Sequence, residues 1–269
     1  MDLRRLILTN LNDTELTRDD VSYAFQQIGQ FFKPYEESGD PGYLLKIIHT
    51  YHVAENCAKL AQMTGCSEED ILLSYVIGLL HDIGRFAEMK ETGEFNGSRY
   101  DHASKGVEML FEEGMIRRFL KKDRYDEIIR TAIADHSLFQ LPQIKDERTL
   151  LHAKLIRDAD KLDNFRVKID EPVENLFPGR ITSKQLLETS YISDTVYDSL
   201  RKRECVKLKD RLTPLDYLVT IIGFYFDLNF EASRQIIHKE NLIRRMIKRF
   251  DFIDEETNAR INEIVSLTE

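Results

Sequence analysis

The sequence predicts an all-α protein, and three observations support this fold class. Apolar residues recur every three or four positions along most of the 269 residues, whereas segments that alternate strictly between apolar and polar residues are nearly absent. Many of the periodic segments begin at a residue that can cap a helix and end at glycine. The composition, with 42% hydrophobic and 32% charged residues, is typical of a globular protein with a buried core.

The first part of the chain predicts a series of helices separated by short turns. Thr17 opens a helix that is expected to end at Pro34, because proline lacks the N–H that continues a helix. Ser67 opens another, which is expected to end near Gly84. Residues 88–100 are polar, contain two glycines and are expected to form a loop. Further helices are expected over residues 43–63, 101–114, 124–137 and 147–167.

A break at residues 172–179, which contain two prolines and a glycine, precedes a second helical set. This set includes an apolar stretch over residues 215–230 and a last amphipathic helix from about Asn241. We therefore expect three parts: an N-terminal helical segment over 1–40, a core over 41–170, and a C-terminal helical extension over 171–269 that packs on the core.

Charge and composition exclude several classes of protein. The net charge of −9 argues against a large nucleic-acid partner, and no apolar stretch reaches the roughly 20 residues that span a bilayer. The three cysteines are an odd number without CxxC spacing, so free thiols are expected. The first residues lack the cleavage site of a signal peptide. These features predict a cytoplasmic protein without a membrane partner.

The dipeptide His81-Asp82 ends a ten-residue apolar run, Ile71 to Leu80. A carboxylate at the end of a buried helix is costly unless it is paired or binds a metal ion. Other residues of ligand type lie on separate helical segments around it. In chain order they are His49, His102, His136 and Asp160.

Helical spacing selects His49 rather than His52 as a ligand. His49 is in line with Leu45 and Val53, whereas His52 is in line with Glu55. Taken alone, His49 would also fit a core histidine that is hydrogen-bonded to a carbonyl.

The same argument places His136 on an apolar stripe with Ile129 and Ile133. His102 begins a helix in which Gly106, one turn on, would leave room for a metal centre, although a surface position is an alternative for this histidine. His152 and His238 have charged neighbours and are expected at the surface.

Asp160 is in line with Ala153 and Ile156, so its carboxylate is expected to face inward, where it needs a cation or several hydrogen bonds. Asp163 is equally close to this face and competes with Asp160, whereas Asp158 lies off it.

The whole set resembles the HD superfamily of metal-dependent phosphohydrolases. The resemblance rests on five segments between residues 49 and about 165: HTYHVAENCAKLA, LLHDIGRF, DHASKGVEML, IIRTAIADHS and RDADKLDNF. It implies a helical bundle with a dinuclear-type centre, in which Asp82 bridges two ions. It also implies that His49, His81 and Asp160 bind one ion, while His102 and His136 bind the other.

The resemblance implies one or two divalent metal ions as cofactors, and nitrogen and carboxylate ligands suit Mn, Fe, Co, Ni, Zn or Mg. The HDIGR segment is similar to the HDIGK of cyclic-di-nucleotide phosphodiesterases in this superfamily, but a Gly-Tyr-Pro signature is lacking. The expected activity is hydrolysis of a phosphate ester or anhydride, by a phosphomonoesterase, phosphodiesterase or pyrophosphohydrolase.

The expected partner is a small phosphorylated substrate, nucleotide-like in kind, which a metal-activated water attacks with Asp82 in the catalytic centre. Arg85, Lys161 and Lys105 are candidates for positioning the phosphate, and a surface ion pair is the alternative for each.

Two other functions remain open at this level. The ligand set also resembles that of a di-iron oxygenase of the same broad fold, and a nucleotide-binding regulatory module without turnover is the third interpretation. The sequence does not define the oligomeric state, and a homo-oligomer is compatible with it.

Overall fold

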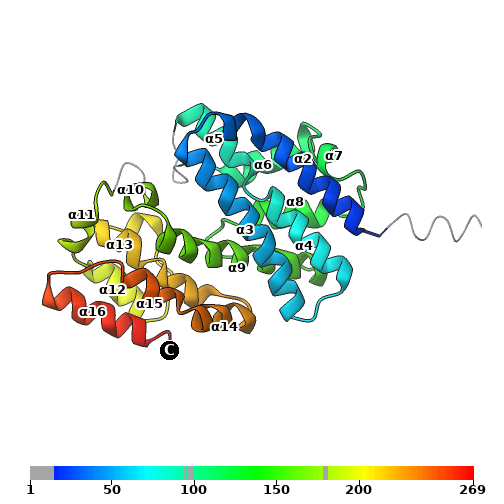
Figure 1. Cartoon of the computed structure of the whole chain (residues 1–269). Coiled ribbons are helices and arrows are strands. Elements are labelled where there is room, and N and C mark those ends of the chain that lie inside the picture. Colours follow the sequence, from blue (N-terminus) through cyan, green and yellow to red (C-terminus); the bar gives the residue numbers. More distant parts are fainter. Residues whose placement is uncertain (1–14, 94, 96–99, 178–180) are drawn as a thin grey trace, which may run out of the picture. The chain divides into compact units, whose positions relative to one another are not determined.

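The computed structural model describes residues 15–93, 95, 100–177 and 181–269 (Figure 1). It is 71% helical, and no strand is present among these residues, so the predicted all-α fold is confirmed. The chain divides into two compact units, Met1–Arg157 and Asp158–Glu269, and the division falls within one continuous helix, α9.

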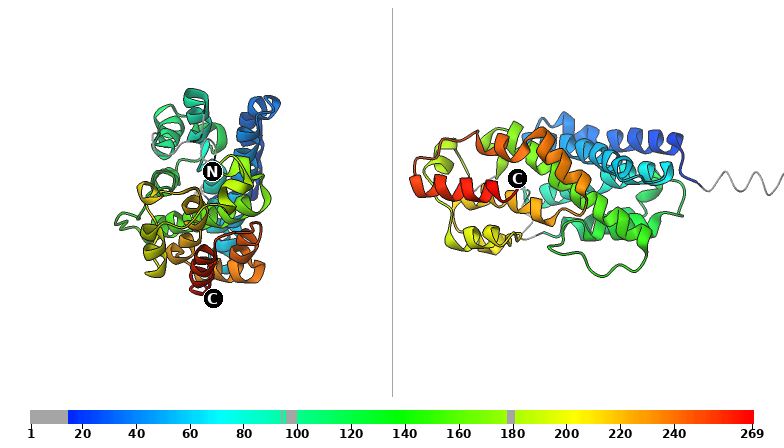
Figure 2. Two further views of the ribbon diagram at one scale, coloured as in Figure 1. Left: turned by 90° about the vertical axis from the view of Figure 1, so that its left-hand side faces the viewer. Right: turned by 90° about the horizontal axis from the view of Figure 1, so that it is seen from below.

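Unit 1 is a bundle in which three long helices are followed by several shorter ones. In Figure 1 and in the right view of Figure 2, α2, α3 and α4 run side by side. The helices of this unit are α2 (Arg18–Glu37), α3 (Pro41–Met63), α4 (Glu68–Leu80), α5 (Ile83–Thr92), α6 (His102–Val107), a π-helical turn (Glu108–Glu112), α7 (Ile116–Phe119), α8 (Asp126–Asp135) and the start of α9 (Glu147–Asp170).

Local sequence explains where the long helices begin. Thr17 accepts a hydrogen bond from the backbone N–H of Asp20, whose carboxylate in turn accepts from the N–H of Thr17, which makes a capping box. The side chain of Asp40 caps α3 by accepting from the N–H groups of Gly42 and Tyr43, with Pro41 in the first helical turn, and Ser67 caps α4 by accepting from the N–H of Asp70.

Two glycines allow the helices that carry the candidate ligands to approach closely. A Cβ on Gly78 of α4 would lie 2.5 Å from the Cα of Ala54 on α3. A Cβ on Gly84 of α5 would lie 2.1 Å from the carbonyl oxygen of His102, at the start of α6. A Cβ on Gly106 would make only ordinary contacts, at 3.5 Å with the backbone nitrogen of Gly84 and with a methyl carbon of Ile83, and the three atoms nearest to it belong to residues other than the predicted ligands.

Unit 2 consists of the rest of α9, from Asp158 on, and of the shorter helices that follow it. Within this unit, Asp216 accepts hydrogen bonds from Ser193, Leu212 and Thr213 and so fixes the loops around α13. Its elements are α10 (Val173–Leu176), α11 (Lys184–Glu188), α12 (Asp194–Arg201), a 3₁₀ turn (Leu208–Asp210), α13 (Pro214–Val219), a second 3₁₀ turn (Ile222–Asp227), α14 (Glu231–Glu240), α15 (Leu242–Ile247) and α16 (Glu255–Ser266).

The expected ends of two helices were wrong. Helix α2 continues past Pro34 to Glu37, because Phe32 and Tyr35 pack on Phe86 and stabilise its last turns. The helix expected to end near Gly84 ends at Leu80, and a new one starts at Ile83.

The loop expected over residues 88–100 begins later than predicted. Helix α5 continues through Glu88 to Thr92 and ends where Gly93 adopts a left-handed conformation. Positions 94 and 96–99 of this expected loop lie outside the described residues. The last amphipathic helix is in fact two helices, α15 and α16, because residues 248–254 leave the helical path.

The expectation of a surface position for His152 was also wrong. His152 is fully buried in unit 1, and its Nε2 lies 3.1 Å from an oxygen of Asp70. Arg148 donates to the same oxygen of Asp70, so a charged network explains why a polar ring is tolerated there.

The cysteines Cys57, Cys66 and Cys205 are free thiols, as expected. Within the described ranges, every helix is too short or too polar to cross a lipid bilayer.

The close approach at Gly84 generates a prediction. Gly84→Ala should lower the free energy of unfolding by about 1–3 kcal/mol, because the new methyl group must push α6 away from α5. Gly29→Ala is the matched control, since its Cβ would make an ordinary 3.7 Å contact with the hydroxyl of Tyr51. Urea denaturation followed by circular dichroism measures both. Equal stability of the two variants would contradict the packing role of Gly84.

Candidate metal centre

The centre of the site is the carboxylate of Asp82, in the short link between α4 and α5. His81 forms the C-cap of α4 and Asp82 the N-cap of α5, and the two residues are 0% and 3% exposed. An aspartate at this position usually accepts hydrogen bonds from the N–H groups of the following helix. Asp82 makes no such bond. Its carboxylate lies among histidines instead.

Each oxygen of Asp82 faces two imidazoles. The Nε2 atoms of His49 and His81 both lie 3.7 Å from Oδ2. On the other side, the Nε2 atoms of His102 and His136 lie 3.4 and 3.6 Å from Oδ1. All four histidines are at most 5% exposed. One carboxylate therefore joins two pairs of nitrogen ligands.

Backbone carbonyls orient two of these rings. Nδ1 of His81 lies 2.8 Å from the carbonyl oxygen of Gly78, and Nδ1 of His136 lies 2.7 Å from that of Ile133. Because a carbonyl only accepts, each Nδ1 must carry the proton, which leaves Nε2 with a lone pair in the neutral ring. This arrangement is typical of metal-binding histidines.

The electrostatics of the site favour an ionised carboxylate at Asp82. Burial by itself would raise the pKa of Asp82, but the nearby charge of Lys46, the largest opposing cause, helps to hold the pKa well below its ordinary value. The charge of Arg85 acts in the same direction.

Burial is the main cause that lowers the pKa of His102 to about 2, and the nearby Arg85 cation contributes. This ring is therefore a neutral donor of a lone pair at neutral pH.

Lys46 is a site residue that the sequence analysis missed. Its Nζ lies 2.8 Å from Oδ2 of Asp82, and its side chain is 17% exposed. It precedes His49 by three residues on α3, so the two side chains share one helix face. This spacing was the available signal, because the face argument applies to lysine as it does to histidine.

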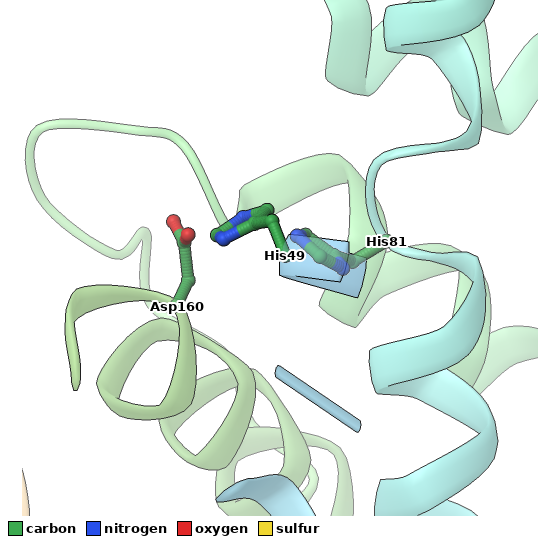
Figure 3. Close-up of side chains that lie close together, drawn as sticks. All are labelled: His49, His81 and Asp160. Atoms are coloured by element: carbon green, nitrogen blue, oxygen red, sulfur yellow. The ribbon is translucent and has the colours of Figure 1, made fainter. Parts of the chain in front are cut away.

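Asp160 lies on α9, three residues after Arg157, the last residue of unit 1. The carboxylate of Asp160 and the rings of His49 and His81, which Figure 3 draws, are one group of side chains of ligand type. A second such group consists of His81, Asp82 and His136. Within unit 1, the structure thus brings five of the six predicted ligands together, with the four histidines around Asp82.

The competing residues have other partners. Asp163 pairs with Arg166 at 2.5 Å, and Asp158 accepts hydrogen bonds from the backbone of Asn229 and Phe230. The side chain of His52 is 43% exposed and lies 3.9 Å from Glu55.

Of the predicted phosphate-positioning residues, the structure places only Arg85 against Asp82. Its Nε lies 3.7 Å from Oδ1 of Asp82. Nζ of Lys161 lies 2.5 Å from a carboxylate oxygen of Asp227, and Lys105 pairs with Glu108 at 3.1 Å. These two lysines are therefore held by other acids.

The residues fit a divalent cation. The Nε2 atoms of His102 and His136 lie only 3.2 Å apart. Two nitrogens bound to one ion at about 2.1 Å are separated by roughly 3 Å, so this spacing suits a shared ion. Imidazole and carboxylate groups form the donor set without a thiolate, which is typical of hydrolytic metal centres.

An all-α fold with a buried centre of histidines and aspartates defines a class of metal-binding helical domain. A family model described as HD domain matches residues 47–164, so this segment of the chain is similar to HD domains. HD domains belong to a superfamily of metal-dependent hydrolases. No curated protein and no solved structure matched the chain in the other two comparisons.

The position of Asp82 predicts that Asp82→Ala loses bound metal. Loss of an outer-shell partner already costs about 10–100-fold in metal affinity, and removal of this carboxylate should cost more. Metal content measured by plasma mass spectrometry should fall while helicity stays close to wild type. His52→Ala is the matched control on the same helix as His49 and should retain metal. Full metal occupancy of Asp82→Ala would refute the centre.

The second pair of histidines predicts a second metal position. Crystals saturated with Mn should show two anomalous peaks about 3.5–4 Å apart, the usual spacing in two-metal sites. In His102→Ala the peak beside His136 should be lost and the other retained. A single peak in the wild-type protein, with both histidines turned away, would assign the site to the mononuclear class.

Proposed function

We propose that the protein is a metal-dependent phosphohydrolase that acts on a nucleotide or a similar small phosphate compound. The observation that carries this proposal is the arrangement around Asp82. Four imidazoles flank its two oxygens, and two cations, Lys46 and Arg85, lie beside the same carboxylate at 2.8 and 3.7 Å. Cations beside a hydrolytic metal centre are well placed to bind an anionic substrate.

The charge balance supports a phosphate substrate. Two divalent ions would contribute four positive charges, of which Asp82 and Asp160 would neutralise two. The remaining charge, together with Lys46 and Arg85, favours a dianionic group over a neutral one. When bound, such ions polarise a phosphoryl oxygen and lower the pKa of a water molecule.

The protein's own residues would then have separate roles in binding the ions and the substrate. His81 and His136 present Nε2 because carbonyls hold their Nδ1 protons, and Asp82 keeps the two pairs of imidazoles together. Arg85 can offer two N–H groups to phosphate oxygens in a fixed plane, whereas Lys46 contributes a point charge. Asp82 and the four histidines are at most 5% exposed, and the exclusion of bulk water from them strengthens each of these interactions.

An aromatic side chain near Lys46 supports a nucleotide-like substrate. Nζ of Lys46 lies 5.9 Å from the ring centroid of Phe95, which meets Tyr43 edge to face at 6.2 Å. A ring beside a phosphate-binding cation could stack on a base while the phosphate reaches the metal centre. The net charge of −9 suits a small substrate better than a nucleic-acid polymer.

The test is hydrolysis by the purified protein with Mn, Co, Ni, Mg or Zn added back after chelation. We expect release of nitrophenol from p-nitrophenyl phosphate or its bis ester, or of phosphate from a panel of nucleotides. Activity should survive strict exclusion of oxygen. Asp82→Ala should abolish turnover, whereas Arg85→Ala and Lys46→Ala should mainly raise KM, by about tenfold each.

Two outcomes would replace this proposal with another function. Strict dependence on dioxygen, with iron as the active metal, would favour the oxygenase. Tight nucleotide binding without turnover under every metal would favour a regulatory module.

A further inference from the structure

Glu88 is a fully buried carboxylate one turn after Arg85 on α5. Its side chain is 0% exposed, and its Oε2 lies 2.6 Å from Nη1 of Arg85. The Arg85 side chain is 17% exposed. A buried ion pair of this kind adds little net stability, because removing both charges from water costs about as much as their attraction returns. A gain in stability therefore does not explain why this ion pair is buried, which points to another role for it.

The pair fixes the direction of the arginine. A guanidinium is planar and carries five N–H groups, so holding Nη1 on Glu88 sets where the others point. Nε is buried, has no hydrogen-bond acceptor among the described residues, and lies 3.7 Å from Oδ1 of Asp82. The N–H groups left over are thus on the side of the metal centre.

Glu88 also competes with Asp82 for the same cation. Asp82 is the nearest other carboxylate that faces Arg85, at a distance longer than a hydrogen bond. Without the charge of Glu88, the guanidinium would move onto Oδ1 of Asp82, the oxygen that faces His102 and His136. The arginine would then be unavailable to a substrate.

We propose that Glu88 is a positioning residue, which holds Arg85 so that its free N–H groups bind a phosphate oxygen at the metal centre. The proposal rests on the proposed phosphohydrolase function, to which it adds a determinant of phosphate affinity. Glu88 itself does not touch the substrate and acts through Arg85.

The experiment measures binding of inorganic phosphate to the Mn-loaded protein by calorimetry, together with kcat and KM for the best substrate found. Glu88→Gln keeps the volume of the side chain and one carbonyl oxygen but removes the charge. Glu91→Gln is the matched control, because Glu91 is an exposed glutamate on the same helix. If Glu88→Gln does not fold, Glu88→Asp takes its place in the experiment. This variant keeps the charge, but its side chain is one methylene shorter.

We expect Glu88→Gln to weaken phosphate binding and to raise KM by about tenfold, the loss typical of one charge-assisted hydrogen bond. Mn content and kcat should change little, and Glu91→Gln should match wild type. In an Arg85→Ala background, Glu88→Gln should have no further effect on phosphate binding.

Unchanged phosphate affinity in Glu88→Gln would overturn the positioning role. So would a loss of phosphate affinity on adding Glu88→Gln to Arg85→Ala that equals the loss caused by Glu88→Gln in the wild-type protein. A wild-type protein that binds Mn and phosphate but hydrolyses nothing would refute the proposed function alone, because phosphate titration still tests Glu88. A wild-type protein that hydrolyses substrates while Glu88→Gln behaves as wild type would refute only the role of Glu88.

Discussion

The buried carboxylate of Asp82 is the constraint on which the centre depends. A charge at 3% exposure is costly unless polar groups surround it, and here they do so from four separate segments of unit 1. His49 and Lys46 come from α3, His81 from the end of α4, and His102 and His136 from α6 and the end of α8. Satisfying one anion therefore fixes the positions of several helices relative to one another.

Other buried aspartates show why Asp82 is different. Asp158 and Asp216 are 0% exposed, and both accept hydrogen bonds from backbone N–H groups of loops that they hold in place. Such carboxylates are satisfied by the fold and have a structural role. Asp82 turns away from the N–H groups of α5 and faces imidazole nitrogens, which are ligands for a cation. The kind of group that surrounds the carboxylate, more than its degree of burial, therefore distinguishes Asp82 from the structural aspartates.

Close helix packing supplies the geometry that this carboxylate needs. Gly78 lets α4 touch the backbone of Ala54 on α3, and Gly84 lets α5 touch the backbone of His102. Larger residues at these positions would separate the helices that carry the histidines. Since metal–nitrogen bonds tolerate only a few tenths of an ångström, small residues at the crossings are as necessary as the ligands themselves.

The sequence by itself determined the all-α class, the helix that leads into His81-Asp82 and the inward faces of His49 and His136, because helical periodicity and capping are local properties. Only the tertiary structure showed that Lys46 pairs with Asp82, that Glu88 is buried on Arg85 and that His152 is in the core. These facts depend on contacts between segments far apart in the chain, or on how deeply a helix face is covered. Periodicity gives the direction in which a side chain points, but the packing of the neighbouring helices decides what it meets there.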